Sequence, residues 1–101
     1  MLNQVVLIGK VVGFESDSKN SHYLLLAVER DFKDFEGKFR IDVIRCVLWK
    51  GISESVKNYY KEGQLISICG RLEENENMPN LVIAEKLSFV GRTTKGEFVK
   101  E

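Results

Sequence analysis

The residues best suited to bind a ligand are aromatic and basic side chains that alternate in one short segment. In residues 30–40, RDFKDFEGKFR, three phenylalanines alternate with four basic residues. Exposed rings beside cations can stack on the bases of a single nucleic-acid strand while the cations neutralise its phosphates. The candidates here are Phe32, Lys33, Phe35 and Phe39. Because Asp31, Asp34 and Glu36 share the segment, an aromatic interface for a protein partner would have a similar composition.

A second pair of candidates, Arg45 and Trp49, comes from alternation within residues 39–49. In a strand, every second residue from Ile44 to Leu48 points to one side, which is wholly apolar and expected in the core. Arg45 and Trp49 then share the other side, roughly 13 Å apart at about 3.3 Å per residue. There the cation can meet a phosphate, and the indole offers a flat platform for a base. The alternative is a core tryptophan beside a solvated arginine.

A third set of candidates consists of cations at or near predicted strand ends. They are Lys10, Lys50 and Arg71. Charged residues at strand ends are commonly solvent-exposed caps, so both a binding role and simple solvation remain open for each.

Patterns typical of catalysis and metal binding are missing from the sequence. The single histidine, His22, has no nucleophile and carboxylate at a spacing that would suggest a triad. Cys46 and Cys69 lie in apolar runs, where free thiols pack as small hydrophobes, and two cysteines with one histidine are too few for a zinc site. The phosphate-binding patterns GxxxxGK and GxGxxG are also absent. The sequence therefore predicts a binding protein without catalytic residues, cofactor or metal.

The elements that must position these side chains follow from periodicity. Runs rich in β-branched and apolar residues predict five strands, at residues 2–12, 22–30, 39–49, 64–72 and 81–90. Glu36-Gly37 predicts the tip of a hairpin between the second and third strands. A helical period predicts one short helix over residues 52–61. Four residues share one side of this helix: Ile52, Val56, Tyr59 and Tyr60.

This order predicts an all-β fold, a five-stranded closed β-barrel with one helix between strands three and four, because closure removes exposed strand edges. It is the order of the OB-fold, although other small barrels remain open. At 101 residues the chain is too short for two ordinary domains. We expect one binding domain over residues 1–91 and a short tail at 92–101.

The charge balance and the lack of targeting signals restrict the expected partners and cellular location. The formal net charge is zero, from 15 basic and 15 acidic residues, so a nucleic-acid-binding role depends on where the charges lie. No apolar run approaches the roughly 20 residues of a transmembrane helix. The opening Met1-Leu2-Asn3-Gln4 lacks the basic region of an export signal. We therefore expect a cytoplasmic location and no membrane contact.

The first predicted strand carries more apolar surface than one barrel needs. Residues 2–8 are apolar on both alternating faces, whereas a lone barrel would bury one face. The surplus predicts that this strand packs against another copy of the chain, in a dimer or tetramer.

From Leu2 to about Val90 the sequence resembles the bacterial single-stranded DNA-binding protein family. The segments that carry the resemblance are LNQVVLIGK at residues 2–10, IDVIRCVLWK at 41–50, YYKEG at 59–63 and GRL at 70–72. The resemblance implies an OB-fold that binds and protects single-stranded DNA without sequence preference. It also implies a role in DNA replication, recombination or repair, and a homotetramer or homodimer.

The resemblance also implies roles for individual residues. The family's stacking aromatics match Phe32 and Trp49, and its strand-three arginine matches Arg45. Its asparagine near the start of strand one matches Asn3, which would contact DNA or a neighbouring subunit.

Several departures from the family pattern imply weaker binding or a shorter binding site. Val43 replaces an early aromatic of strand three, and Glu62 replaces a lysine. The long basic hairpin between strands four and five is reduced to the acidic residues 73–77. The family's tail with its acidic tip has no counterpart in residues 91–101, so we expect no tail-mediated recruitment of repair enzymes.

Three functions therefore remain open at the level of sequence. The first is a passive coat for single-stranded DNA. The second is an OB-fold protein-interaction module, like the small primosomal relatives of the family, with weak or vestigial nucleic-acid binding. The third is an RNA-binding barrel.

Overall fold

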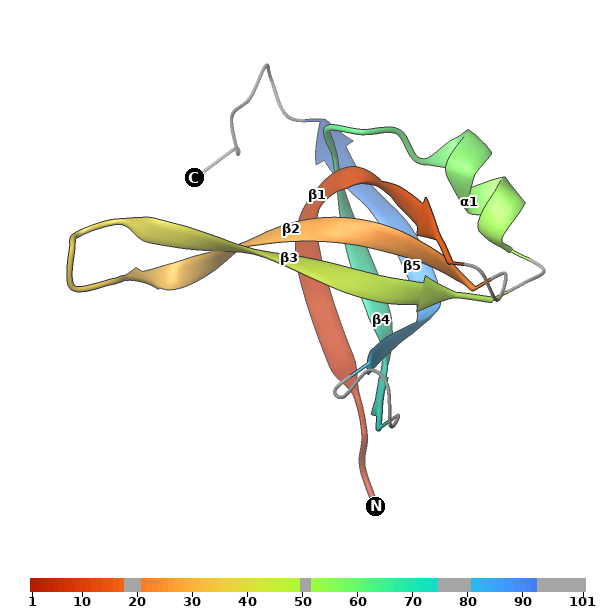
Figure 1. Ribbon diagram of the computed structural model, residues 1–101, viewed down its shortest axis with the longest axis horizontal. Helices are drawn as coiled ribbons and strands as arrows, with labels where there is room; N and C mark the ends of the chain where they lie inside the picture. Colours follow the sequence, from red (N-terminus) through yellow and green to blue (C-terminus); the bar gives the residue numbers. More distant parts are fainter. Residues whose placement is uncertain (18–20, 50–51, 75–80, 93–101) are drawn as a thin grey trace.

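The computed structural model describes residues 1–17, 21–49, 52–74 and 81–92. The elements are β1 (Val5–Ser16), β2 (His22–Lys33), β3 (Phe39–Leu48), α1 (Ser53–Tyr59), β4 (Gln64–Glu73) and β5 (Leu81–Arg92). The strands close into a barrel in the order β1-β2-β3-β5-β4, as Figure 1 shows. The predicted all-β class, five-stranded barrel and helix between the third and fourth strands are confirmed. In these ranges, no helix is long and apolar enough to cross a membrane.

Closure of the barrel depends on β1, which pairs with two strands in succession. Its first half, Val5 to Lys10, pairs with β4, and its second half, Lys10 to Ser16, pairs with β2. The strand crosses β2 closely at Gly9, where a Cβ atom would lie 2.4 Å from the carbonyl oxygen of Ala27. Only a residue without a side chain allows this approach. The ring is completed by a short parallel pairing of β3 with β5.

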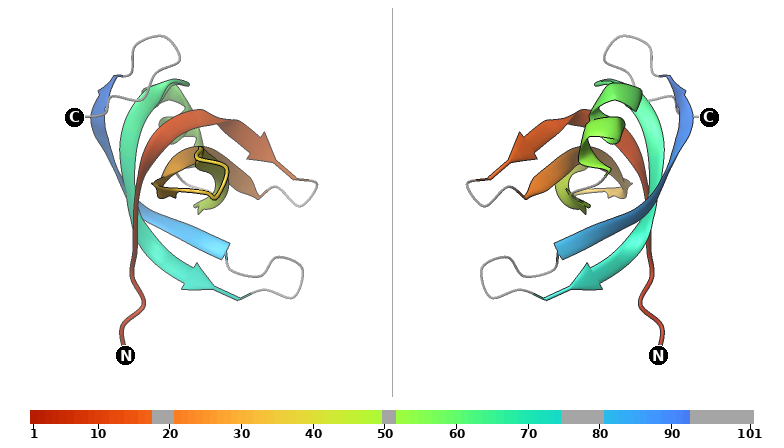
Figure 2. Two further views of the ribbon diagram at one scale, coloured as in Figure 1. Left: turned by 90° about the vertical axis from the view of Figure 1, so that its left-hand side faces the viewer. Right: turned by 90° about the vertical axis from the view of Figure 1, so that its right-hand side faces the viewer.

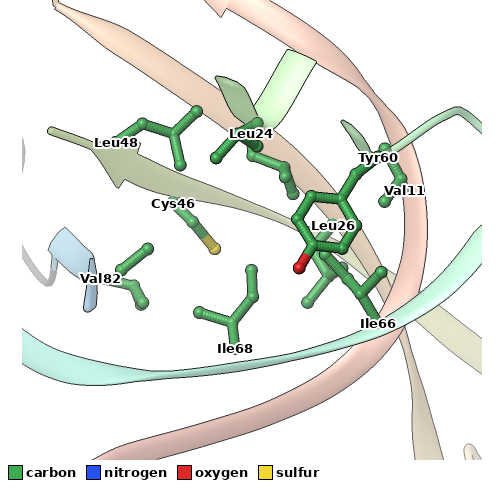
Figure 3. Close-up of a cluster of buried hydrophobic side chains, with 11 residues drawn as sticks. Val11, Leu24, Leu26, Cys46, Leu48, Tyr60, Ile66, Ile68 and Val82 are labelled. Atoms are coloured by element: carbon green, nitrogen blue, oxygen red, sulfur yellow. The ribbon is translucent and has the colours of Figure 1, made fainter. Parts of the chain in front are cut away.

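The core fills the inside of the barrel with side chains from every strand and from α1 (Figure 3). Its largest fully buried members are Leu24, Leu26, Ile66, Ile68, Val11 and Cys46. Val56 and Tyr60 extend the cluster from the helical segment. Cys46 is therefore a core residue, as its apolar run predicts, and both cysteines are free thiols.

β1 and β2 extend furthest beyond their predicted ends. β1 continues to Ser16, beyond its predicted end at residue 12, and its residues Glu15 and Ser16 pair with Tyr23 and His22. Pairing with β2 supplies backbone hydrogen bonds that local polarity does not reveal, and the polar side chains stay exposed. β2 likewise continues to Lys33, beyond its predicted end at residue 30.

The helix is shorter than predicted, and two residues predicted to share one side of it, Tyr59 and Tyr60, point to different surroundings. Tyr59 ends α1, and at Tyr60 the backbone is already extended, with φ −107° and ψ 129°. This change of direction sends Tyr60 into the core and leaves Tyr59 outside, where its ring meets that of Tyr60 edge-on at 5.1 Å. The helical period predicts that Tyr59 and Tyr60 lie on one side, and this fails because the helix ends between them.

Beyond the barrel, β2 and β3 continue as a two-stranded arm, which we define as residues 30–41. The arm projects away from the barrel on the left of Figure 1, and Figure 2 shows it end-on. A register shift between Glu29 and Lys33 separates the arm from the barrel part of the same strands. Its turn contains Gly37 at φ 81°, a conformation that favours glycine, at the predicted hairpin tip.

Candidate nucleic-acid interface

The aromatic residues of the arm point to solvent. Phe32 is 83% exposed and Phe35 is fully exposed at the turn, while Phe39 is partly covered. The Nζ atom of Lys33 lies 5.6 Å from the centre of the Phe39 ring, a cation–π contact. The arm thus presents two solvent-facing rings, Phe32 and Phe35, and a third ring, Phe39, that is partly covered and contacts Lys33.

The turn of the arm is organised by Asp34. Its Oδ1 accepts hydrogen bonds from the backbone N–H groups of Glu36 at 2.8 Å and Lys38 at 3.0 Å. Its Oδ2 accepts one from Nε of Arg40, whose Nη2 also contacts Glu36 at 2.8 Å. The backbone hydrogen bond from Lys38, followed by that from Arg40, lowers the pKa of the Asp34 carboxyl. The charge of Arg40 is therefore engaged inside the arm.

A second ion pair crosses the base of the arm. Nε and Nη2 of Arg30 donate hydrogen bonds of 2.9 Å to the two carboxylate oxygens of Asp42. These bonds lower the pKa of the Asp42 carboxyl. Both arginines of the arm are thus held by carboxylates, and the lysines at positions 33 and 38 are its other cations.

The barrel part of β3 alternates as predicted. Cys46 and Leu48 are buried, whereas Val43 and Arg45 are exposed. The guanidinium carbon of Arg45 lies 5.3 Å from the centre of the Tyr23 ring, and its Nη2 lies 3.1 Å from Oε1 of Glu15. Arg45 is therefore neither buried nor simply solvated, because it lies over a neighbouring aromatic ring beside a carboxylate.

Trp49 follows the last residue of β3 and is 54% exposed, so its interpretation as a core residue is wrong for this chain. Its backbone is fixed by α1, because its carbonyl oxygen accepts hydrogen bonds of 3.1 Å from the N–H groups of both Ile52 and Ser53. An indole on a backbone anchored in this way is a ready stacking platform. The neighbouring candidate, Lys50, lies outside the described residues.

The remaining candidates lie elsewhere on the barrel. The side-chain amide of Asn3 donates to the carbonyl of Leu72 at 2.8 Å and accepts from its N–H at 2.9 Å, tying the N-terminal segment to β4. Arg71 donates to Glu73 at 2.7 Å and to Glu85 at 2.6 Å. Lys10 is partly buried on β1, opposite Ala27 of β2 and Leu65 of β4.

Six of the candidates lie on β2 and β3, in the turn between them or directly after β3. They are Phe32, Lys33, Phe35, Phe39, Arg45 and Trp49. Asn3 and Arg71 are instead joined to β4 and β5 by hydrogen bonds that stabilise the barrel. Two residues around Arg45, Tyr23 and Glu15, were missed by sequence reasoning. The pairing of β1 with β2 places Glu15 opposite Tyr23, and the pairing of β2 with β3 brings Arg45 beside them, so the cluster depends on the register of three strands.

Comparison with known proteins points to one family. A sequence model described as "Single-strand binding protein family" matches residues 2–81. The "Single-stranded DNA-binding protein 1" of Streptococcus pyogenes is 34% identical over 94 residues, which are 84% of this chain and 72% of that protein. The "Single-stranded DNA-binding protein B" of Bacillus subtilis is 31% identical over 97 residues, 87% of this chain and 86% of that one.

Two solved structures are similar in fold. The crystal structure of a small single-stranded DNA-binding protein from Streptomyces coelicolor matches with a TM-score of 0.62 at 14% identity, covering 89% of this chain and 95% of its own. A deletion mutant of the single-stranded DNA binding protein from Thermus aquaticus matches with a TM-score of 0.58 at 28% identity, covering 88% of this chain and 50% of its own.

Proposed function

Because this chain belongs to the single-strand binding protein family, we propose that it binds and protects single-stranded DNA in replication, recombination or repair, in the cytoplasm. The observation that carries this proposal is the exposure of Phe32 on β2, Arg45 on β3 and Trp49 directly after β3. No relative named above favours the alternative of a protein-interaction module.

The proposed mechanism is passive binding, with no catalytic step. Bases stack on the rings of Trp49 and Phe32, with Phe35 and Phe39 as further rings on the arm. Each stacked base contributes about 1–3 kcal/mol without regard to sequence, because every base has a π-face. Arg45 and the lysines at positions 10, 33 and 50 are proposed to meet phosphates. A strand held in this way is extended and unable to pair.

A competition assay tests this function against its alternatives. Labelled oligo-dT is bound by the protein and displaced with unlabelled oligo-dT, oligo-U or duplex DNA of the same length. We expect oligo-dT to compete best and duplex DNA worst, because the bases of a duplex are already stacked on one another. Preference for oligo-U would indicate an RNA-binding barrel, and a protein that does not bind the labelled oligo-dT at all would favour a protein-interaction module.

We further propose that the chain forms a homodimer or homotetramer through β1. Val6 and Ile8 are 58% and 55% exposed, while Val5 and Leu7 of the same strand pack against the core. These exposed apolar side chains are the second apolar face of residues 2–8, which a lone barrel would leave unburied. Light scattering at micromolar concentration should give at least twice the mass of one chain. Ile8→Glu should reduce it, and a monomeric wild type would contradict the proposal.

A further inference from the structure

We propose that Glu15 competes with DNA phosphate for Arg45, so that binding exchanges a carboxylate partner of this arginine for a phosphate. The inference rests on the proposed function and adds a residue that regulates its strength. Glu15 makes this contact from β1, across the barrel surface from the strand that carries Arg45.

The contact runs diagonally over three strands. Glu15 of β1 pairs with Tyr23 of β2, and Arg45 of β3 pairs with Leu25, two residues further along β2. The guanidinium of Arg45 therefore lies above the Tyr23 ring, with its Nη2 directed to the carboxylate of Glu15. A carboxylate and a phosphate present similar oxygens to an arginine, so both would use the same edge of the guanidinium.

Arg45 is held less firmly than the other arginines whose side chains the structure describes. Arg30 makes two hydrogen bonds of 2.9 Å to one carboxylate, and Arg40 and Arg71 each contact two different carboxylates. Arg45 approaches Glu15 at 3.1 Å, the longest of these contacts, and both side chains are 45% exposed. A single exposed contact of this kind contributes little to stability, whereas Arg30, Arg40 and Arg71 each make at least two hydrogen bonds to carboxylates. Arg45 is therefore the arginine that can change partner.

Tyr23 keeps Arg45 in place during the exchange. Its ring is buried beneath the guanidinium, and its hydroxyl donates a hydrogen bond of 3.0 Å to Asp17 Oδ2. The cation–π contact does not depend on Glu15, so only the Glu15 side chain has to rotate away. The arginine remains on the face of the barrel that the proposed DNA path crosses.

The competition predicts an unusual salt dependence. Added salt weakens the contact of Arg45 with phosphate, because counterions compete for the nucleic acid. Salt also screens the pair of Arg45 with Glu15 and so weakens the competitor. The two effects partly cancel in the wild type, and removal of Glu15 should expose the full salt dependence of the arginine.

A double-mutant cycle tests the inference. Affinity for oligo-dT is measured over a range of salt concentrations for the wild type, Glu15→Gln, Arg45→Met and the double variant. We expect Glu15→Gln to tighten binding about two- to fivefold at low salt. It should steepen the slope of log affinity against log salt by up to about 0.7. In the Arg45→Met background the gain should nearly disappear.

A matched control separates the specific pair from a general charge effect. Glu85→Gln also removes one negative charge from an arginine pair, but Arg71 keeps its two hydrogen bonds to Glu73. We expect this variant to bind like the wild type. Thermal unfolding checks that each variant folds. If Arg45→Met does not fold, Arg45→Gln takes its place in the cycle.

Three results would overturn the inference while leaving the proposed function intact. The first is an equal gain in affinity from Glu15→Gln with and without Arg45. The second is a gain from Glu85→Gln equal to that from Glu15→Gln. The third is weaker binding by Glu15→Gln, which would make Glu15 a positioning residue. A wild type that binds no oligo-dT would instead contradict the proposed function itself, and the inference with it.

Discussion

Arg30 and Asp42 join β2 to β3 at the base of the arm through two hydrogen bonds of 2.9 Å. The pair lies where the arm leaves the barrel, so the order of the arm depends on the charge of Asp42. Because these bonds lower the pKa of Asp42 in the folded protein, the stabilisation is fully present above its ordinary value of 3.8. It is lost as the pH falls through the lower folded-state pKa.

The arm should therefore loosen in acid. We expect the backbone amides of the arm to show unchanged order from pH 7 to about pH 4 and increased motion below pH 3.8, measured by NMR relaxation. Asp42→Asn should show this increased motion already at pH 7. An arm that is equally ordered in the variant and the wild type would show that the Arg30–Asp42 pair does not hold it.

Gly9 should be intolerant of any side chain. Gly9→Ala places a Cβ atom 2.4 Å from the carbonyl oxygen of Ala27, a backbone atom that cannot move aside cheaply. We expect a loss of about 1–3 kcal/mol in the free energy of unfolding, measured by urea titration. Gly91→Ala is the matched control, since a Cβ there meets nothing within 4 Å, and it should change stability by no more than about 0.5 kcal/mol. Equal effects would contradict the close crossing of β1 and β2.

Cys46 should be inert in the folded protein. Burial raises the pKa of its thiol from 9.0 to about 12. At pH 8 this lowers the thiolate fraction about a thousandfold. We expect iodoacetamide, with peptide mass mapping, to label Cys46 far more slowly in the native protein than in urea. Similar labelling rates in the two states would show that Cys46 is not held in the core.

The same shift has a consequence for stability in alkali. Because the folded-state pKa of Cys46 is the higher one, its contribution is fully present below about pH 9 and is lost as the pH rises toward 12. Burial also raises the pKa of Tyr23 and Tyr60, so their ionisation likewise lowers the stability of the folded protein at high pH. Unfolding free energy should therefore fall above pH 9, and less steeply in Cys46→Ala.

The fold and part of the site could be predicted because their signals are local. Alternation along residues 39–49 predicts that Arg45 and Trp49 point outward, and the structure leaves both exposed. The partners of Arg45 could not be predicted in this way. Glu15 reaches it only because β1 continues to Ser16 past a bulge between Val11 and Gly13, and such a register is a property of the assembled barrel.

The charges of the arm show the same limit. The residue types and their spacing predict a segment with charges of both signs, but they do not predict which cations form ion pairs. The structure pairs Arg30 with Asp42 and Arg40 with Asp34, residues that lie on opposite sides of the hairpin or at its turn. Which cations remain for phosphates therefore depends on the hairpin register and not on the sequence count.

The fluorescence of Trp49 tests the proposed binding face most directly, because it is the only tryptophan of the chain. Addition of oligo-dT should quench its emission saturably. Trp49→Ala should weaken binding by about 1–3 kcal/mol for each stacked base lost. Because the side chain is half exposed, thermal stability should change little. Emission that does not respond to DNA, together with an alanine variant that binds DNA as tightly as the wild type, would contradict a stacking role for Trp49.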